Sequence, residues 1–389
     1  MKRIVFCVAL VLMGLILLLG LPLSGEAIPY TFTKIADTHG DFGYFLDSAV
    51  SINNNGQVAF WGYLKSGDKG IFVSDGNTIT PVILPPQGTI TSAHEPSGIN
   101  DNGTVLFQGG LATGVNGIFT YNYLSGSLTT IASSGTFSGF GGRSINNGGA
   151  VAFRAGLNIP NREGIFTGNG GSTTTIATND GHPITAFSGD PVINEKGEVV
   201  FLGNGVFISN QSGELTNITA GMGVSEPDIN DDGTVIFGGT NLQGTGLFIY
   251  KAGMIMPIVD ESGPLSGFEA FLAINNDETV VFRAFLDIGG MGIFTGPDPL
   301  ADRVIATGDP LFGSTVADLF FFRAGLNDAS QIAFWARLED GTQGIYRADP
   351  ITANPIPEPS TLILFSIAAV SLLVRSWRCR KQTASTTNR

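Results

Sequence analysis

The chain has 389 residues, a formal net charge of −13 and only two cysteines. Cys7 and Cys379 lie near its two ends, which excludes disulfides and cysteine-ligated metals from everything between them. The acidic balance argues against binding to nucleic acid or to an anionic membrane surface.

The chain begins with a basic tripeptide, an apolar run over 4–23 and small residues up to Ala27. This order is typical of a secretory signal peptide, and it predicts export with cleavage after Ala27. An uncleaved anchor helix is the alternative. A short strand is then predicted over 31–36, where Thr-Phe-Thr-Lys-Ile-Ala is rich in β-formers.

A nine-residue phrase, apolar-Asn-x-x-Gly-x-Val-x-Phe, organises the middle of the chain. Its spacing of 36 to 52 residues and its richness in Val, Ile and Phe favour four-stranded propeller blades over helical repeats. Asn, Asp and Gly in its centre suit a tight hairpin turn with positive φ. Copies six and seven carry Glu278 and Ser330 in place of the Gly, so looser turns are predicted there. The copies begin at Ile52, Ile99, Ile145, Ile193, Ile229, Ile274 and Leu326.

A second phrase, Gly-Ile-Phe or a close variant, follows each copy and predicts a third strand, and most copies then show a fourth. The seventh copy has no fourth strand, whereas the spare strand at 31–36 resembles the fourth strand of the third copy. We therefore predict an all-β, seven-bladed β-propeller of four-stranded blades, closed by the N-terminal strand in the last blade. Closure removes the exposed edges of an open array.

The C-terminal segment has three parts in a fixed order: a Pro-Glu-Pro motif, an apolar stretch over 362–374 and a basic cluster. It resembles the PEP-CTERM sorting signal of Gram-negative bacteria. That resemblance implies processing by an exosortase-type membrane enzyme, transient anchoring at the inner membrane, and delivery to the cell surface or medium. An ordinary C-terminal anchor is the alternative. The residues that carry the motif are Pro357, Glu358, Pro359, Arg375, Arg378 and Arg380.

The predicted organisation has five parts, and the membrane is contacted only through the terminal ones. These are a signal peptide (1–27), the propeller (28–352), a linker with the Pro-Glu-Pro motif (353–361), the hydrophobic segment with its basic cluster (362–381) and a tail (382–389).

No catalytic motif, cofactor fingerprint or metal-ligand spacing stands out, so the sequence predicts no catalytic residue, no cofactor and no metal. A His/Asp metal site and calcium in the acidic turns are weaker alternatives. Arg154 and Arg283, which directly follow the blade Phe, are expected to reach solvent or to pair with a carboxylate between blades, and a ligand contact is the alternative. The loop residues weighed for a metal are His39, His94, His182, Asp37, Asp41, Glu95, Asp180 and Asp190.

Second-to-third and fourth-to-first strand loops share one face of a propeller, and here they vary most. Variable loops on a fixed scaffold are where binding residues concentrate. The sequence thus predicts a non-enzymatic exported propeller that binds extracellular polysaccharide or a surface protein through this face. A secreted hydrolase or lyase acting on polysaccharide, and a structural spacer without a ligand, are the alternatives.

Overall fold

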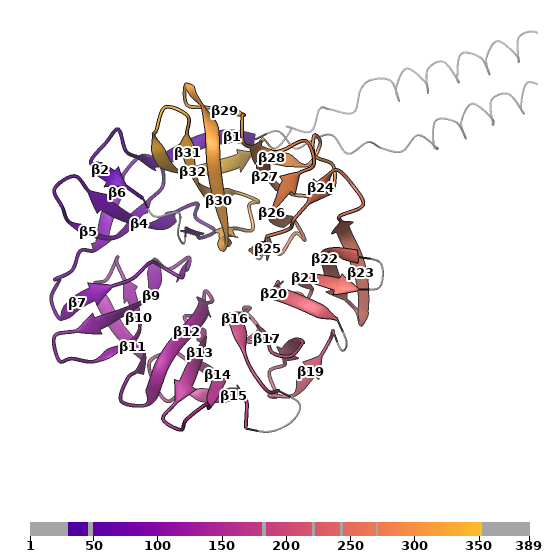
Figure 1. Ribbon diagram of the computed structural model, residues 1–389. Helices are drawn as coiled ribbons and strands as arrows, with labels where there is room; N and C mark the ends of the chain where they lie inside the picture. Colours follow the sequence, from indigo (N-terminus) through magenta and orange to yellow (C-terminus); the bar gives the residue numbers. More distant parts are fainter. Residues whose placement is uncertain are drawn as a thin grey trace, which may run out of the picture. The chain divides into compact units, whose positions relative to one another are not determined.

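The computed structural model describes residues 30–45, 50–180, 184–219, 222–241, 244–269 and 271–351. Within these ranges the chain is all-β and forms seven antiparallel sheets arranged as blades around one axis (Figure 1). No helix that could cross a bilayer occurs in this described part. The predicted signal peptide with Ala27, and the sorting segment from Pro357 to Arg380, lie outside it.

The first three blades follow the predicted order of strands from the axis outward, and their repeats supply the inner hairpins. Blade 1 contains β2 (Phe42–Tyr44), β3 (Ser51–Ile52), β4 (Val58–Leu64), β5 (Lys69–Ser74) and β6 (Ile79–Ile83). Blade 2 contains β7 (Ile90–Ala93), β8 (Gly98–Ile99), β9 (Thr104–Leu111), β10 (Asn116–Asn122) and β11 (Ser127–Ser133). Blade 3 contains β12 (Phe137–Ile145), β13 (Val151–Leu157), β14 (Glu163–Gly168) and β15 (Thr174–Thr178).

Blades 4 to 6 repeat the arrangement, and no strand of blade 4 is longer than six residues. Blade 4 contains β16 (Ser188–Ile193), β17 (Val199–Leu202), β18 (Val206–Ser209) and β19 (Leu215–Asn217). Blade 5 contains β20 (Gly223–Ile229), β21 (Val235–Asn241), β22 (Gly244–Lys251) and β23 (Met254–Asp260). Blade 6 contains β24 (Leu265–Ser266), β25 (Leu272–Ile274), β26 (Val280–Leu286), β27 (Met291–Phe294) and β28 (Arg303–Ala306).

Blade 7 closes the ring as predicted, because its outermost strand comes from the N-terminal end of the domain. The pairing places Phe32 opposite Ala348 and Ala36 opposite Ile345, and Figure 1 shows indigo β1 beside the last strands of the chain. The Thr33 hydroxyl also donates to Asp349 Oδ2 at 2.6 Å. The blade contains β29 (Pro310–Leu311), β30 (Ser314–Leu326), β31 (Ile332–Leu338), β32 (Gln343–Pro350) and β1 (Tyr30–Asp37).

The hydrophobic core lies between blades rather than at the axis. Seven clusters of buried side chains each join two neighbouring blades; the closing one packs Ile35 and Trp335 of blade 7 against Phe60 of blade 1. Each blade also pairs its repeat Phe with the aromatic residue of the Gly-Ile-Phe phrase, with ring centroids 5.6 to 6.1 Å apart. Both faces of each sheet are therefore covered, which explains why the strands do not alternate apolar with polar residues.

The glycine of the Gly-Ile-Phe phrase is required by the approach of the fourth strand. A Cβ on Gly70 would lie 1.9 Å from the Ile83 carbonyl oxygen, and one on Gly117 would lie 2.2 Å from that of Ala132. The ladder shifts register just after this glycine, between Ile71 and Phe72 in blade 1. A side chain here would push the outer strand away from the blade.

The inner hairpin turns are uniform, and the prediction of looser turns in copies six and seven is wrong. Glu278 and Ser330 adopt φ of 61° and 54°. Their N–H groups donate to Asn275 O and Asn327 O at 3.1 and 3.0 Å, as the Gly56 N–H donates to Asn53 O at 3.0 Å. The ring forces these two residues into the left-handed region that the glycines adopt freely, so the turn keeps its shape and carries strain instead.

Glu278→Gly is therefore expected to stabilise the domain by about 0.5–1 kcal/mol. Relief of left-handed strain contributes about 1–2 kcal/mol, partly offset by the greater freedom of glycine in the unfolded chain. Urea unfolding measures the change. The matched variant is Gly197→Ala, since Gly197 has φ of 80° and open space around its Cβ position; it should lose about 1 kcal/mol. Destabilisation by Glu278→Gly would contradict a strained turn.

Candidate functional site

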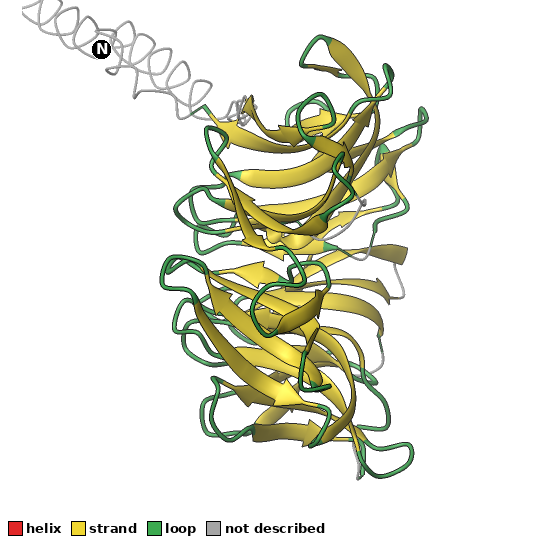
Figure 2. Ribbon diagram, turned by 90° about the vertical axis from the view of Figure 1, so that its left-hand side faces the viewer, coloured by secondary structure: helices red, strands yellow, loops and turns green. Residues whose placement is uncertain are grey.

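Two cavities lie on the axis, one toward each face of the ring. One has a volume of about 180 Å³ and the other of about 200 Å³. Both are lined by the same ring of aliphatic side chains, which are the first residues of the seven repeats: Ile52, Ile99, Ile145, Ile193, Ile229, Ile274 and Leu326. Along each inner strand, residues before this ring face the loop side and residues after it face the side of the Asn turns. We call these the loop face and the turn face; Figure 2 shows the connections gathered at both.

The turn face is built on a closed ring of buried asparagines. Each Nδ2 donates to the backbone carbonyl of the corresponding Asn in the next blade at 2.9 to 3.3 Å, and Asn327 closes the circle onto Asn53. Each Oδ1 accepts the backbone N–H four residues later in its own turn at 2.8 to 3.0 Å. The members of this asparagine ring are Asn53, Asn100, Asn146, Asn194, Asn230, Asn275 and Asn327.

A second ring of side chains lines the mouth of the turn-face cavity. Each side-chain oxygen accepts the backbone N–H of the matching residue in the preceding blade at 2.5 to 3.0 Å. The four carboxylates of this second ring thus already accept hydrogen bonds from backbone N–H groups of the turns. Across the described ranges no three His, Cys, Asp or Glu side chains converge as metal ligands would. The members are Asn54, Asp101, Asn147, Glu195, Asp231, Asn276 and Asp328.

The loop face differs, because charged side chains from four blades meet at its axis. We call Arg143, Asp190, Glu226, Asp228 and Arg323 the axial charged cluster. Arg323 Nη2 lies 3.2 Å from Asp190 Oδ2, and its Nη1 lies 3.9 Å from Glu226 Oε2. Arg323 reaches the axis because β30 carries an irregular stretch between Phe321 and Leu326. One guanidinium thus links blade 7 to blades 4 and 5.

Blade 3 contributes Arg143 to this site, together with the adjacent pair Gly141 and Gly142. Arg143 Nη1 donates to Gln108 Oε1 at 3.2 Å and to the Gly141 carbonyl at 3.1 Å. A Cβ on Gly142 would lie 1.5 Å from Asp190 Oδ1. Only a glycine therefore lets the Asp190 carboxylate approach this strand so closely.

Burial sets the protonation of two carboxyls in the cluster. Asp228 is buried and accepts the Ile274 N–H at 2.9 Å. Burial raises the pKa of Asp228 to about 6, against the attraction of Arg323. Burial likewise raises the pKa of Glu226, again opposed by Arg323. Both carboxyls are thus more readily protonated than exposed ones.

This shift predicts a pH-dependent effect of Asp228→Asn. Because the pKa of Asp228 is about 6 in the folded chain and lower when unfolded, wild-type stability falls as pH rises from 4 to 6. The loss amounts to about 3 kcal/mol. Asp228→Asn should match the wild type near pH 3.5 and be more stable by up to about 3 kcal/mol above pH 7. Urea unfolding across this range measures it, and a pH-independent difference would contradict it.

Three phenylalanines extend the site toward blades 6 and 7. Phe271, Phe320 and Phe322, which we call the aromatic trio, are half-buried, with ring centroids 4.8 to 5.7 Å apart. The Arg283 guanidinium lies 4.2 Å from the centre of the Phe320 ring. All three precede the axial aliphatic residues of their blades, so they lie on the loop face beside Arg323.

Arg154 and Arg283 bridge neighbouring blades, but they do so through backbone carbonyls and not through a carboxylate of the next blade. Arg154 Nη1 donates to the Phe187 carbonyl at 2.9 Å, and Arg283 Nη1 donates to the Leu319 carbonyl at 2.6 Å. Their nearest carboxylates are Glu163 at 3.7 Å and Glu269 at 2.8 Å. Both arginines hold the first strand of the following blade, and Arg154 also borders the axial charged cluster.

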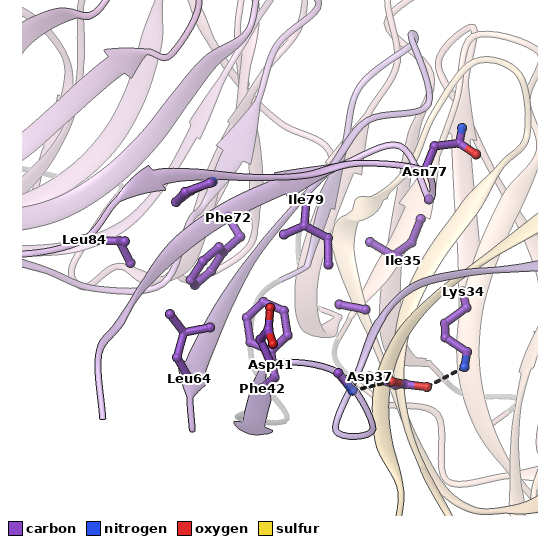
Figure 3. Close-up of a pocket in the computed structure, with 14 residues that line it drawn as sticks. Lys34, Ile35, Asp37, Asp41, Phe42, Leu64, Phe72, Asn77, Ile79 and Leu84 are labelled. Carbon is purple, nitrogen blue, oxygen red and sulfur yellow. Dashed lines mark hydrogen bonds and ion pairs between the residues drawn. The ribbon is translucent and has the colours of Figure 1, made fainter. Parts of the chain in front are cut away.

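A further pocket of about 470 Å³ lies at the closure seam, between β1 and the outer strands of blade 1. Figure 3 shows Phe42, Phe72 and Leu64 at its apolar side and the ion pair of Lys34 with Asp37, 2.5 Å long, at its edge. Burial alone would raise the pKa of Asp37, but Lys34 and two backbone N–H groups outweigh it and lower that pKa. The seam pocket is separate from the axis.

The structure disperses the loop residues weighed for a metal site. His39 is 70% exposed and lies 3.7 Å from Asp37, Asp41 lines the seam pocket, and Asp180 pairs with Arg162. Of that set only Asp190 belongs to the axial charged cluster. His182 lies outside the described residues.

Sequence reasoning missed Arg143, Glu226, Asp228 and Arg323. The available signal was their position, because each stands one to three residues before the first residue of a repeat.

No known protein-family profile matches the chain, and no curated protein sequence matches it. Among solved structures it is similar to an oligogalacturonate lyase in complex with manganese, with 13% identity, coverage of 84% of this chain and 98% of that one, and a TM-score of 0.53. A prolyl endopeptidase matches with 12% identity, 85% and 51% coverage and a TM-score of 0.52. Prolyl oligopeptidase B from Galerina marginata matches with 9% identity, 86% and 50% coverage and a TM-score of 0.52. The chain thus spans about half of either peptidase, and at these identities the likeness shows the propeller fold alone.

Proposed function

We propose that this chain is an exported, non-catalytic propeller that binds extracellular polysaccharide on its loop face. The observation that supports this most is the axial charged cluster lying beside the aromatic trio. Concave sites that combine apolar rings with a few convergent polar groups are typical ligand sites. Sugar rings present apolar C–H faces and polar hydroxyls, which suit aromatic faces and charged groups respectively.

A second aromatic pair lies farther around the same face. Tyr44 and Tyr63 stack with centroids 4.0 Å apart where β4 ends, and Lys69 lies 5.4 Å from the Tyr63 ring. Aromatic side chains therefore occur on this face in blades 6 and 7 and again in blade 1. An extended polymer fits such a surface better than a compact ligand does.

Binding and sorting belong together in this proposal. The signal peptide ending at Ala27 supports export, and the tail with Pro357, Glu358 and Pro359 supports processing by an exosortase-type enzyme. Fractionation of a tagged chain tests the sorting. Replacing the Pro-Glu-Pro motif by alanines should retain the protein in the membrane fraction, and unchanged delivery to the surface would remove this half of the proposal.

Affinity electrophoresis of the purified domain in gels containing polysaccharides tests the binding. Phe322→Ala should weaken retardation at least tenfold. The matched control is Leu124→Ala, because Leu124 is 71% exposed and lies beside the turn-face residue Gly103. No retardation by any polysaccharide, with capture of a surface protein instead, would redirect the proposal to a protein ligand.

A hydrolase or lyase is the second candidate, and one observation favours it. Asp190 and Glu226 contact the same guanidinium, which places them within about 10 Å of each other, in the range used by carboxylate pairs in glycoside cleavage. The raised pKa of Glu226 suits a proton donor. Release of reducing ends that is lost in Glu226→Gln would establish this candidate over a non-catalytic role.

A further inference from the structure

We infer that the pocket at the closure seam binds a small amine with an apolar body, that is, an aromatic or alkyl group that carries an ammonium. Strand β1 lines one side of this seam pocket, and blade 1 lines the other. Its lining shares no residue with the axial charged cluster or the aromatic trio. The inference is therefore independent of the proposed binding of polysaccharide.

The two sides of the seam pocket touch each other directly, so the protein forms the pocket without help from a ligand. Ser74 Oγ of blade 1 donates to the Ile35 carbonyl of β1 at 3.4 Å. In the following β5–β6 turn, a Cβ on Gly76 would lie 2.5 Å from Thr33 Cγ2, so this turn packs against β1. A ligand loses less conformational free energy on entering a preformed pocket than on opening one.

The size and the lining of the pocket suit a small organic molecule. Its volume of about 470 Å³ falls within the ~300–1,000 Å³ of pockets that enclose small ligands. Phe42 and Phe72 meet edge to face in its wall, with ring centroids 4.9 Å apart, and Ile35 and Leu64 extend the apolar surface. Ile79 also lines the pocket, yet 41% of its surface is exposed. An apolar ligand would cover this surface, which is favourable in water.

One carboxylate of the lining is available to a cation. The Asp37 carboxylate is occupied, because Lys34 and two backbone N–H groups donate to it. Asp41 lies beside Phe42 at the pocket (Figure 3), and no ion pair to its carboxylate occurs among the described residues. Lys65, which is not part of the lining, donates to the Gly40 carbonyl at 2.7 Å. Asp41 can therefore pair with the ammonium of a ligand.

An anion or a sugar would fit the same pocket less well. Asp41 would repel an anion, and Lys34, the one cation among the described lining residues, is already paired with Asp37. The chain as a whole carries −13, so its field attracts cations and repels anions at long range. A sugar would bring several hydroxyls to a wall of aliphatic and aromatic side chains that cannot bond to them.

Binding at this pocket would also strengthen the closure of the ring. Because β1 and blade 1 both line the pocket, a bound amine contacts both sides of the seam at once. A ligand that binds only the folded protein stabilises it by mass action. At ten times its dissociation constant, the amine is therefore expected to raise the thermal midpoint by about 2–4 °C.

Isothermal titration of the purified protein at 0.15 M salt, with three indoles that differ in one group, tests the inference. The probes are tryptamine, which carries an ammonium, tryptophol, which carries a hydroxyl, and indole-3-propionate, which carries a carboxylate. Tryptamine is expected to bind with a dissociation constant below about 1 mM. It should bind about three- to fivefold more tightly than tryptophol, as an exposed ion pair allows, and about tenfold or more tightly than indole-3-propionate.

Substitutions at exposed positions show whether the probe occupies this pocket. Ile79→Lys places a cation in the lining and should weaken tryptamine binding about tenfold, whereas Ile159→Lys, at an exposed isoleucine of blade 3, should change it less than twofold. Asp41→Asn should remove the preference for tryptamine over tryptophol. Its matched control is Asp287→Asn, at an exposed aspartate of blade 6, which should keep that preference.

Tryptophol or indole-3-propionate binding as tightly as tryptamine would overturn the inference, and so would absence of binding by all three. Full tryptamine affinity in Ile79→Lys would place the probe elsewhere and would overturn it as well. Should Ile79→Lys not fold, Asp41→Asn decides, because Asp41 is exposed and its side chain makes no hydrogen bond among the described residues. A preference for tryptamine that survives in Asp41→Asn would contradict the role of that carboxylate. None of these outcomes bears on the proposed binding of polysaccharide.

Discussion

Deletion of β1, residues 30–37, is expected to destabilise the domain by about 5 kcal/mol and to lower its thermal midpoint by about 10 °C. The strand supplies the whole outer ladder of blade 7. It also supplies Ile35 and Ala36 to the cluster that joins blade 7 to blade 1. Without it, β32 becomes an exposed edge, and the contact between blades 7 and 1 loses two of its buried side chains. Thermal unfolding monitored by circular dichroism measures the change.

Complementation in trans separates closure from a general effect of truncation. A synthetic peptide of residues 30–37 should restore the midpoint of the deletion variant by adding back the missing strand. The same peptide with Ile35→Asp is the matched control, because Ile35 is 3% exposed in the closing cluster; it should restore little. A deletion variant as stable as the parent would show that β1 does not close the ring.

The architecture was predictable because its signals are local and repeated. Each blade carries its own Asn turn, with glycine at the fourth position in five of the seven copies, its own Phe and its own Gly-Ile-Phe phrase or a close variant, so a departure in one copy does not hide the pattern. The last copy lacks a fourth strand and a spare strand lies at 31–36, and closure of the ring by that strand explains both. The prediction of looser turns at Glu278 and Ser330 was wrong, because the ring imposes a left-handed conformation that the local propensity of these residues opposes.

The axial charged cluster was not predictable for the opposite reason. Arg323 and Asp190 are 133 residues apart, and no other blade repeats their pairing in the part of the chain that the structure describes. A pattern read from all seven repeats keeps only what the repeats share, so residues that occur in a single blade do not appear in it. The two faces therefore differ in kind: the turn face repeats one hydrogen-bonding device seven times, whereas the loop face carries residues that occur once each. This difference supports placing the proposed ligand site on the loop face.

Asn230→Ala is expected to destabilise the domain by about 4 kcal/mol, because it removes several buried bonds from the asparagine ring at once. Asn230 Nδ2 donates to the Asn275 carbonyl at 3.2 Å, and its Oδ1 accepts the N–H groups of Asp232 and Thr234 at 3.1 and 3.0 Å. Asn230 is 3% exposed, so water cannot replace these partners freely. Asn230→Asp should be similarly costly at neutral pH, since it keeps the acceptor but buries a charge beside a carbonyl oxygen.

Asn210 provides a matched control within blade 4. Its Oδ1 accepts the N–H groups of Ser212 and Glu214 at 3.0 and 2.9 Å, as in a ring turn, but the turn is exposed and no hydrogen bond to another blade involves it among the described residues. Asn210→Ala should cost about 1 kcal/mol or less. Equal losses for Asn210→Ala and Asn230→Ala in urea unfolding would show that the turn alone accounts for the cost. A loss at Asn230 several times larger would assign it to the link between blades, which is the contact that a closed ring requires and an isolated hairpin does not.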